Sequence, residues 1–238
     1  FHENDAAFKQ ALIKKGVDCR GVKCSETPSG HAIIQVTPSG ENAIVLFGGA
    51  NQTITAKTVM QALDGTKPSD WVLTQNETSS IDQVLRQAKE KQLKVAFNPA
   101  PMSESVKSLP LECIDLLIVN ETEAAALTEK DSLDDIVAVF KEQWSECEVI
   151  ITLGKAGVMM LKNNDCIKVD AFLVDAVDTT AAGDTFIGYF LSAYSNHTDA
   201  KRALIRGCAA SAIAVTREGA AQSIPTQKEV DRFLAKHS

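Results

Sequence analysis

The sequence predicts an α/β protein in which a mostly parallel sheet is flanked by helices and accompanied by a small β-hairpin. From about Ile54 onwards, short apolar runs of strand length alternate with longer segments whose apolar residues recur at helical spacing. This alternation is typical of a parallel sheet, because each strand is connected to the next through a helix. Before Ile54, two β-rich runs follow one another without a helical pattern between them, which indicates a hairpin.

Bulk composition argues against several classes of function. The 238 residues are 45% hydrophobic and 23% charged, as in globular proteins. The 31 acidic and 24 basic residues give a net charge of −7, which argues against nucleic acid or an acidic membrane as the main partner. The apolar runs are far shorter than the ~20 residues that cross a bilayer, and the scattered cysteines and histidines lack metal-ligand spacing. We therefore expect a cytoplasmic protein with reduced thiols.

The first 52 residues are expected to form a helix and the hairpin. Apolar residues at helical spacing predict a helix over residues 5–15, which ends at Gly16 because glycine readily adopts the conformation that closes a helix. Two runs rich in β-forming residues, 31–37 and 42–47, flank the turn sequence Pro38-Ser39-Gly40-Glu41.

The remaining residues, 53–238, are expected to form one α/β domain. Its strands are short apolar runs that end at polar, glycine or proline residues, and its helices carry an apolar stripe. The strands are predicted over residues 70–74, 94–97, 115–119, 148–152 and 158–161. The helices are predicted over residues 81–91, directly after 120, and over 132–144, 181–194, 199–216 and 227–236. Ligands of such sheets bind where the strands end.

Residues 174–193 are the stretch around which the rest is organised. A turn that ends in Ala181, Ala182 and Gly183 leads from an extended segment into an amphipathic helix. A helix start has unpaired N–H groups and about +0.5 of an elementary charge, so an anion can bind there where side chains are small. Asp184 follows at once and can take a proton from a substrate hydroxyl. A tight turn with a favourable acid in the first helical turn explains the same residues without a ligand.

Other polar segments follow predicted strands. Asn120 can cap a helix, and Glu123 three residues later completes the pattern of a capping box. The glycines within residues 152–157 are explained by a β-turn, and Asn98-Pro99-Ala100-Pro101 by prolines that end a strand. An acid at a strand end, such as Glu77, is usually just solvated.

Four segments together resemble the ribokinase family of sugar and nucleoside kinases. They are N-P-A-P at 98–101, N-E-T-E-A at 120–124, T-L-G-K-A-G at 152–157 and D-T-T-A-A-G-D-T-F at 178–186. The resemblance covers nearly the whole chain and implies a three-layer ribokinase-like (Rossmann-like) fold, in which the hairpin of residues 31–47 is a lid.

The resemblance also implies ATP-dependent phosphorylation of a sugar hydroxyl, with conversion of D-ribose to ribose 5-phosphate as the favoured reaction. Asp184 would be the general base, and the amides of Ala181–Gly183 would form an anion hole for the γ-phosphate. Glu123 would organise Mg²⁺ through water, since Mg²⁺ prefers oxygen ligands and retains its waters. Glu77 would touch the sugar.

Further positions follow from the same resemblance. The nucleotide would contact Asn120, Thr152, Leu153, Gly154, Lys155, Ala156, Gly157, Gly183 and Cys208. A monovalent cation, usually K⁺, would be enclosed by Asp178, Thr180, Ala214, Arg217, Gly219 and Ser223. Pairing of the lid with the lid of another subunit implies a homodimer, which the exposed edge of a two-stranded hairpin also favours.

Members of this family begin with a first strand that carries a sugar-binding Asp, followed by a glycine-rich segment. This chain begins at Phe1 without them, so we expect it to be part of a longer protein and to have weak or no sugar kinase activity by itself. Two alternatives stay open: a related kinase that acts on fructose, deoxyribose or adenosine, and a non-catalytic nucleotide-binding or dimerisation module. The chain has no G-x-x-x-x-G-K-[ST] motif, so it is not a P-loop kinase.

Overall fold

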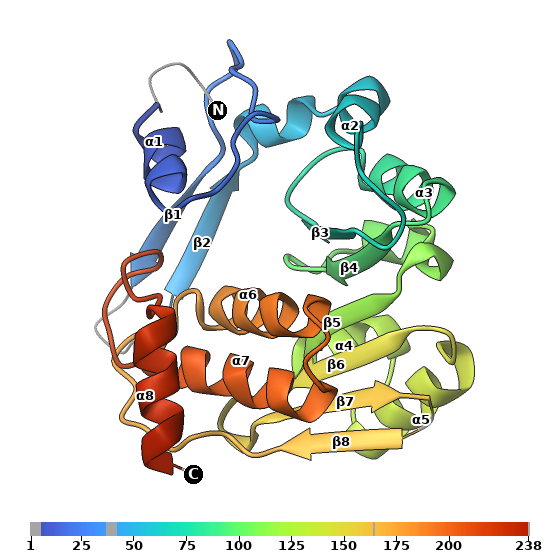
Figure 1. The fold of residues 1–238 in the computed structure, drawn as a ribbon. Coiled ribbons are helices and arrows are strands. Elements are labelled where there is room, and N and C mark those ends of the chain that lie inside the picture. Colours follow the sequence, from blue (N-terminus) through green and yellow to red (C-terminus); the bar gives the residue numbers. More distant parts are fainter. Residues whose placement is uncertain (1–5, 37–41, 164, 238) are drawn as a thin grey trace. The chain divides into compact units, whose positions relative to one another are not determined.

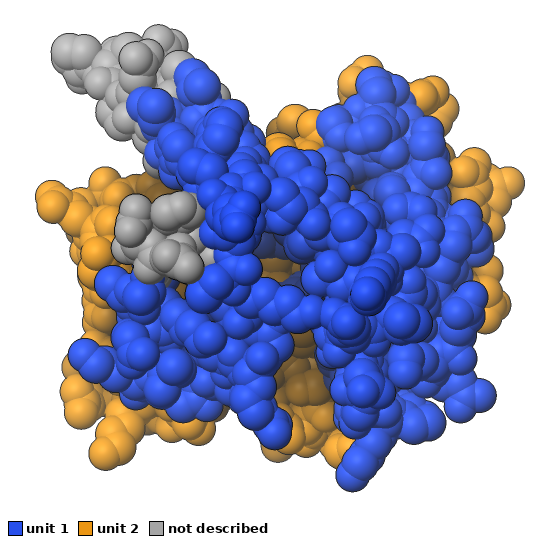
Figure 2. All heavy atoms as spheres, turned by 90° about the horizontal axis from the view of Figure 1, so that it is seen from above, with its two compact units in different colours: residues 1–95, 103–113 blue, residues 96–102, 114–238 orange. Residues whose placement is uncertain are grey.

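The computed structural model describes residues 6–36, 42–163 and 165–237. The chain forms two compact units, which Figure 2 shows in different colours. The first contains residues 1–95 and 103–113, and the second contains residues 96–102 and 114–238. The division expected from the sequence, after residue 52, separates the hairpin from the α/β domain and stays a prediction.

The first unit contains the N-terminal helices and strands. They are α1 (Ala6–Lys14), β1 (His31–Val36), β2 (Asn42–Phe47), α2 (Ala56–Ala62), β3 (Trp71–Gln75), α3 (Ile81–Glu90) and the first residues of β4 (Lys94–Asn98). Short 3-10 helices lie at Gly49–Thr53, Glu104–Ser108 and Leu111–Cys113. The sequence did not predict α2, because this helix is only 7 residues long and buries one side chain, Val59.

The hairpin forms a two-stranded sheet of its own. Its strands pair in antiparallel register from His31 opposite Phe47 to Val36 opposite Asn42, so the predicted hairpin is confirmed. The predicted turn at residues 38–41 lies outside the described residues.

The larger sheet has six strands in the order β3-β4-β5-β6-β7-β8, where β5 is Leu116–Asn120, β6 is Glu148–Thr152, β7 is Val158–Lys162 and β8 is Asp165–Val169. β5 is parallel to both β4 and β6, whereas β7 is antiparallel to both β6 and β8. The predicted helix-flanked α/β sheet is therefore confirmed, in a mixed form. A short turn joins β6 to β7, and only two residues separate β7 from β8, whereas a parallel connection needs about a dozen residues or more.

Helices of the second unit cover both faces of β5–β8. Figure 1 shows α6 (Ala182–Ser195) and α7 (Ala200–Ala214) on one face, and α4 (Glu121–Thr128) and α5 (Leu133–Gln143) on the other. The last helix, α8 (Gln227–His237), packs against α7. Among the described residues, no helix has both the length and the apolar character needed to cross a membrane.

The core of the second unit fixes the position of α6. Phe190 of α6 is fully buried, as are Ile150 and Met160 of the sheet. A Cβ added to Gly207 of α7 would lie 2.7 Å from the ring of Phe186. This glycine therefore lets α6 and α7 approach closely, which sets the geometry of the site below.

Candidate functional site

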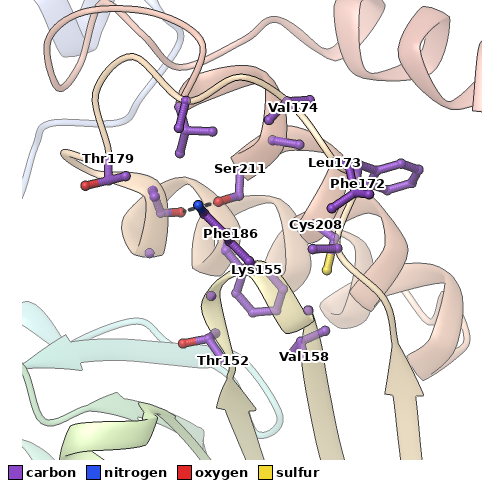
Figure 3. Close-up of a pocket in the computed structure, with 18 residues that line it drawn as sticks. Thr152, Lys155, Val158, Phe172, Leu173, Val174, Thr179, Phe186, Cys208 and Ser211 are labelled. Atoms are coloured by element: carbon purple, nitrogen blue, oxygen red, sulfur yellow. Dashed lines mark hydrogen bonds between the residues drawn. The ribbon is translucent and has the colours of Figure 1, made fainter.

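The second unit contains a cavity of about 460 Å³, a size typical of small-molecule sites. Its walls are the turn after β6, the segment after β8, the start of α6 and one face of α7 (Figure 3). Several residues predicted to bind nucleotide or phosphate line it together: Thr152, Gly154, Lys155, Gly157, Ala182, Gly183 and Cys208.

The start of α6 has no side-chain cap. Its N-cap residue, Ala181, has a left-handed backbone with φ of 57° and makes no side-chain hydrogen bond. The N–H of Ala182 donates to Thr179 O at 3.2 Å, and that of Thr185 donates to Ala181 O at 2.9 Å. A Cβ added to Gly183 would meet no atom within 4 Å. The first turn of α6 therefore presents accessible main chain to the cavity, as an anion site requires.

The turn after β6 is held by its own main chain. The N–H of Leu153 donates to Gly157 O at 2.8 Å around a short 3-10 helix, Gly154–Ala156. Gly157 has φ of 98°, and a Cβ at this position would lie 2.1 Å from Val169 O. Only glycine fits there, because the turn packs directly on the end of β8. The predicted turn is confirmed, and its role in binding a nucleotide stays a prediction.

The segment 171–176 between β8 and α6 supplies an apolar wall that was not among the predicted site residues. Phe172 and Val174 are half-buried, whereas Leu173 is 87% exposed. The segment has neither helical nor strand periodicity, so the only signal in the sequence was its run of apolar residues. From α7, Cys208 faces the same cavity, and burial raises the pKa of its thiol to about 12.

The start of α4 is closed by its own side chains. Asn120 Oδ1 accepts the N–H of Glu123 at 2.8 Å, and Glu123 Oε2 accepts the N–H of Asn120 at 2.9 Å. The predicted capping box is therefore confirmed. Asn98 Nδ2 donates to Glu123 Oε2 at 3.4 Å and to Ile118 O at 2.8 Å, a role for the N-P-A-P segment that the sequence did not indicate. Burial raises the pKa of Glu123, and hydrogen bonds from Asn120 and Asn98 oppose this shift.

The structure does not bring every predicted residue into the first cavity. Asn120 lies beside Thr152 in the sheet register but is not part of the lining. Asp184 is exposed and lines a second cavity, of about 820 Å³, between α6, α7 and α8. Gly183 and Asp184 are consecutive residues, so the first turn of α6 separates the two cavities. In the described part of the chain, Thr185 Oγ1 is buried without a hydrogen-bond partner.

The two loops of the predicted cation site are joined through Asp178. Its carboxylate accepts the N–H of Thr180 at 2.8 Å and that of Gly219 at 3.0 Å, and these bonds lower the pKa of Asp178. The side chain of Arg217 donates to Glu229 at 2.5 Å and to Ser223 O at 3.4 Å. The main-chain oxygens of these loops are the type of ligand that suits a large, weakly hydrated cation, although the guanidinium of Arg217 already engages the oxygen of Ser223.

Glu77 follows β3 in the first unit. Its main-chain oxygen accepts Gln52 Nε2 at 3.0 Å, so this polar segment is tied to the loop after the hairpin. The described residues contain no cluster of three His, Cys, Asp or Glu side chains that could hold a metal ion alone. Any Mg²⁺ would thus depend on water and on a bound phosphate for most of its ligands.

Comparison with known proteins gives a consistent result. The family model described as "pfkB family carbohydrate kinase" matches residues 3–227. The ribokinase of Haemophilus influenzae is 38% identical over 235 residues, which are 95% of this chain and 76% of that protein. The ribokinase of Staphylococcus aureus is 37% identical over 222 residues, which are 89% of this chain and 71% of that protein.

Solved structures are similar as well. The crystal structure of ribokinase from Thermotoga maritima superimposes with a TM-score of 0.82 at 34% identity and covers 98% of this chain and 78% of that chain. The structure of Arabidopsis thaliana ribokinase complexed with ribose and ATP superimposes with a TM-score of 0.75 at 28% identity. This match covers 89% of this chain and 70% of that chain. The uncapped helix start and the cavity thus lie in a chain whose family is established: it belongs to the pfkB family of carbohydrate kinases.

Proposed function

We propose that this chain carries the nucleotide and phosphoryl-transfer site of an ATP-dependent sugar kinase whose substrate is D-ribose and whose product is ribose 5-phosphate. The observation that carries this proposal is the uncapped start of α6, where Gly183 lines one cavity and Asp184 the next. Sequence similarity to two ribokinases and structural similarity to a ribokinase complexed with ribose and ATP support the choice of substrates.

The main chain at the start of α6 would hold the transferring group. In the reaction, the 5-hydroxyl oxygen of ribose bonds to the γ-phosphorus while the bond from that phosphorus to the bridging oxygen of ADP breaks. Asp184 receives the hydroxyl proton, and the amides of Ala181–Gly183 hold the charge on the γ-phosphoryl oxygens. Because the first turn of α6 separates the two cavities, donor and acceptor can approach it from opposite sides.

We infer that Mg²⁺ is held near the buried carboxylate of Glu123, because this side chain offers the oxygen donor that Mg²⁺ prefers. The hydrogen bonds from Asn120 and Asn98 both go to Oε2, so Oε1 is the atom that would hold a metal-bound water. The ion, when bound, neutralises charge on the phosphate oxygens. Removal of Mg²⁺ should abolish turnover, and activity in EDTA would contradict this role.

K⁺ is the cation that we infer for the loops joined by Asp178. Carbonyl oxygens at Ala214, Arg217 and Gly219, with Thr180 and Ser223, would enclose it and would shape the nearby start of α6. Replacement of K⁺ by Li⁺ should lower turnover, since the smaller ion does not fill a site built for a larger one. Equal rates in the two salts would contradict the assignment.

For the nucleotide, we infer contacts with Asn120, with the turn 152–157 and with Cys208. The turn and the thiol line the same cavity as Gly183, which supports one continuous site for ATP. Glu77 remains our candidate for contact with the sugar. Its replacement by Gln should raise the KM for ribose and leave the KM for ATP unchanged, and the reverse pattern would contradict this role.

A deoxyribose kinase is the second candidate. The deoxyribokinase of Salmonella typhi is 30% identical over 216 residues, which are 88% of this chain and 70% of that protein. Fructose and adenosine are further acceptors to test, and a non-catalytic nucleotide-binding module is the alternative outside enzymes. Comparison of kcat/KM for ribose, 2-deoxyribose, fructose and adenosine separates these candidates, and turnover on none of them favours the module.

We also infer a homodimer formed through the hairpin, in a cytoplasmic protein. Ile33 and Val45, which lie opposite each other on one face of the hairpin, are 55% and 62% exposed, and a partner would cover this apolar surface. Val45→Glu should convert a dimer to a monomer in light scattering, and an unchanged dimer would contradict this interface. Fractionation of the native host tests the location, and recovery in a membrane or secreted fraction would contradict it.

The decisive test replaces the general base. Asp184→Asn should lower turnover by about 10²–10⁴, the usual contribution of a positioned base, while the affinity for ATP changes little. Coupled ADP release measures the first quantity and calorimetry the second. Asp131→Asn, the same change at an exposed residue between α4 and α5, is the matched control. Full activity in Asp184→Asn would overturn the assignment.

A further inference from the structure

The two ends of the first cavity differ in chemistry. Figure 3 shows Thr179, from the turn before α6, at one end, and Phe172, Leu173 and Cys208 together at the other. Under the proposed function, the first end receives the phosphates. The second end, which we call the base end, then receives the nucleoside base.

The base end offers almost no side chain that could read a base by hydrogen bonding. The lining residues of the segment 171–176 are all alanine, valine, leucine or phenylalanine. Ala212 of α7 and Val215, directly after this helix, are apolar, and Ser211 Oγ already donates to Ala182 O at 3.0 Å. Cys208 is the remaining polar group of α7 in the lining. Burial keeps its thiol protonated, so it makes at most a weak hydrogen bond.

The other polar side chains of the lining belong to different elements. Thr152 and Lys155 come from the turn after β6, and Thr179 from the turn before α6. The hydroxyl of Thr152 donates to Val119 O at 3.4 Å within the sheet. None of these side chains belongs to the segment 171–176 or to α7, which together form the walls of the base end.

This distribution limits how strongly the base can be selected. Adenine carries an amino donor where guanine carries a carbonyl acceptor, so hydrogen-bonding side chains can distinguish the two purines. A site with such groups rejects the wrong ligand by about 10⁴–10⁵, whereas an apolar pocket discriminates by only about 10–200-fold. The walls of the base end are apolar, so we expect this cavity to discriminate between purines only weakly.

We propose that the first cavity accepts purine nucleoside triphosphates in general, so that GTP and ITP serve as phosphate donors alongside ATP. This inference rests on the proposed function, and the reaction is the same: the γ-phosphoryl group passes from GTP to the sugar hydroxyl, GDP leaves, and Asp184 takes the proton. Selection is by the apolar area of the purine ring and by the triphosphate. Pyrimidine nucleotides, whose smaller ring buries less apolar surface, bind more weakly.

The direct test is competition on the intact chain. A fluorescent N-methylanthraniloyl-ADP probe is bound and then displaced by ATP, GTP, ITP or inorganic tripolyphosphate. The expected result is that the three nucleotides differ by less than about 200-fold and that each competes better than tripolyphosphate. A preference for ATP beyond this range would overturn the proposal, because main-chain groups of residues 171–176 would then be reading the base. Equal competition by tripolyphosphate would also overturn it.

A matched pair of variants tests whether the base end is the selecting surface. Leu173 is 87% exposed and lines the cavity, whereas Val177 is 62% exposed and lies outside the lining. Leu173→Ala should lower the affinities for ATP, GTP and ITP in the same proportion and leave the affinity for tripolyphosphate unchanged. Val177→Ala should change none of these affinities. A loss confined to ATP in Leu173→Ala would contradict selection by apolar contact.

Turnover separates this inference from the proposed function. If the three nucleotides compete as expected but none phosphorylates a sugar, the proposed function fails on this chain and the base selectivity stands. If ribose is phosphorylated from ATP and not from GTP or ITP, the proposed function stands and the general purine site is wrong.

Discussion

Two helices of the second unit, α4 and α6, begin in opposite ways. At α4 the N-cap residue is Asn120, whose backbone is extended, and a reciprocal pair of hydrogen bonds with Glu123 closes the first turn. At α6 the N-cap residue is Ala181, whose backbone is left-handed, and no side chain caps the turn. Both helix starts carry the same partial positive charge. The difference is that α4 satisfies its N–H groups with its own side chains, whereas α6 leaves room for a ligand to do so.

One unit can thus contain both a helix start that stabilises the fold and a helix start that is open to a ligand. A capped start adds about 0.5–2 kcal/mol to stability, and its amides are then already engaged. An uncapped start forgoes that contribution, and it adopts a left-handed alanine that costs about 1–2 kcal/mol. Such a site is expected where binding, and not folding, has determined the sequence.

The largest expected effect on ligand binding comes from closing the open start of α6. Gly183→Ala places a methyl group in space that is otherwise open, and it should block one hydrogen bond from the helix start to a phosphate. Bonds of this charged kind contribute about 1.5–3 kcal/mol, so ATP affinity should fall by about 10–150-fold. Calorimetry with ATP measures this loss.

The same substitution one and a half turns further along α6 is the control. A Cβ at Gly188 would also meet no atom within 4 Å. Gly188→Ala should raise stability by up to about 1 kcal/mol through helix propensity without changing ATP affinity. If Gly183→Ala and Gly188→Ala bind ATP equally well, the start of α6 is not the phosphate site.

A smaller effect is expected from opening the closed start of α4. Asn120→Ala removes the cap and should lower the free energy of unfolding by about 0.5–2 kcal/mol, measured by urea titration. Ser132 caps α5 by accepting the N–H of Asp135 at 3.1 Å, and its hydroxyl donates to Asp135 Oδ2 at 2.6 Å, but this cap is not a reciprocal capping box. The loss in Asn120→Ala should exceed that in Ser132→Ala, and an equal or smaller loss would contradict the value of the reciprocal box.

The smallest effect is a change in pH dependence. Burial raises the pKa of Glu123 above its ordinary value of 4.5, so the native chain holds this proton more tightly than the unfolded chain. The free energy of unfolding therefore loses a contribution as pH rises from about the unfolded pKa through the folded one. Glu123→Gln keeps a side-chain oxygen that can accept the N–H of Asn120 but removes the titration, so the stability of this variant should fall less over this window.

Urea titrations between about pH 4 and pH 8, which bracket the titration of a buried carboxyl, compare the two proteins. Asp131→Asn, the exposed control, should show the pH dependence of the unaltered chain. A parallel decline in Glu123→Gln and the unaltered chain would mean that the folded environment does not raise the pKa of Glu123.

Local patterns predicted much of the second unit. The predicted strand 148–152 matches β6 residue for residue, because an apolar run bounded by a charged and a polar residue leaves little freedom. The reciprocal cap at α4 also followed from two residues at fixed spacing. In contrast, β8 was missed, since its 5 residues include Asp165 and Lys168 and are mostly exposed, so that no buried pattern marks it.

The cavity could be predicted only in part. Its glycine-rich segments carry a signal, because tight turns and open helix starts restrict residue type. The apolar wall of the cavity carries no such signal, since residues 171–176 follow no helical or strand period. They line a cavity only because the fold places α6 and α7 opposite them. The hydrogen bond from Asn98 to Glu123 likewise joins residues 25 apart and depends on the parallel pairing of β4 with β5.

The thiol of Cys208, inside the cavity, is expected to resist oxidation and alkylation. Peroxides and alkylating agents attack the thiolate form of cysteine, and they need access to it. Cys208 is only 8% exposed and its pKa is about 12, so the thiolate is scarce at neutral pH. Cys24 and Cys166 lie on the surface, where oxidants meet them first. Oxidants would therefore modify the surface thiols of this protein well before they modified the thiol in the cavity.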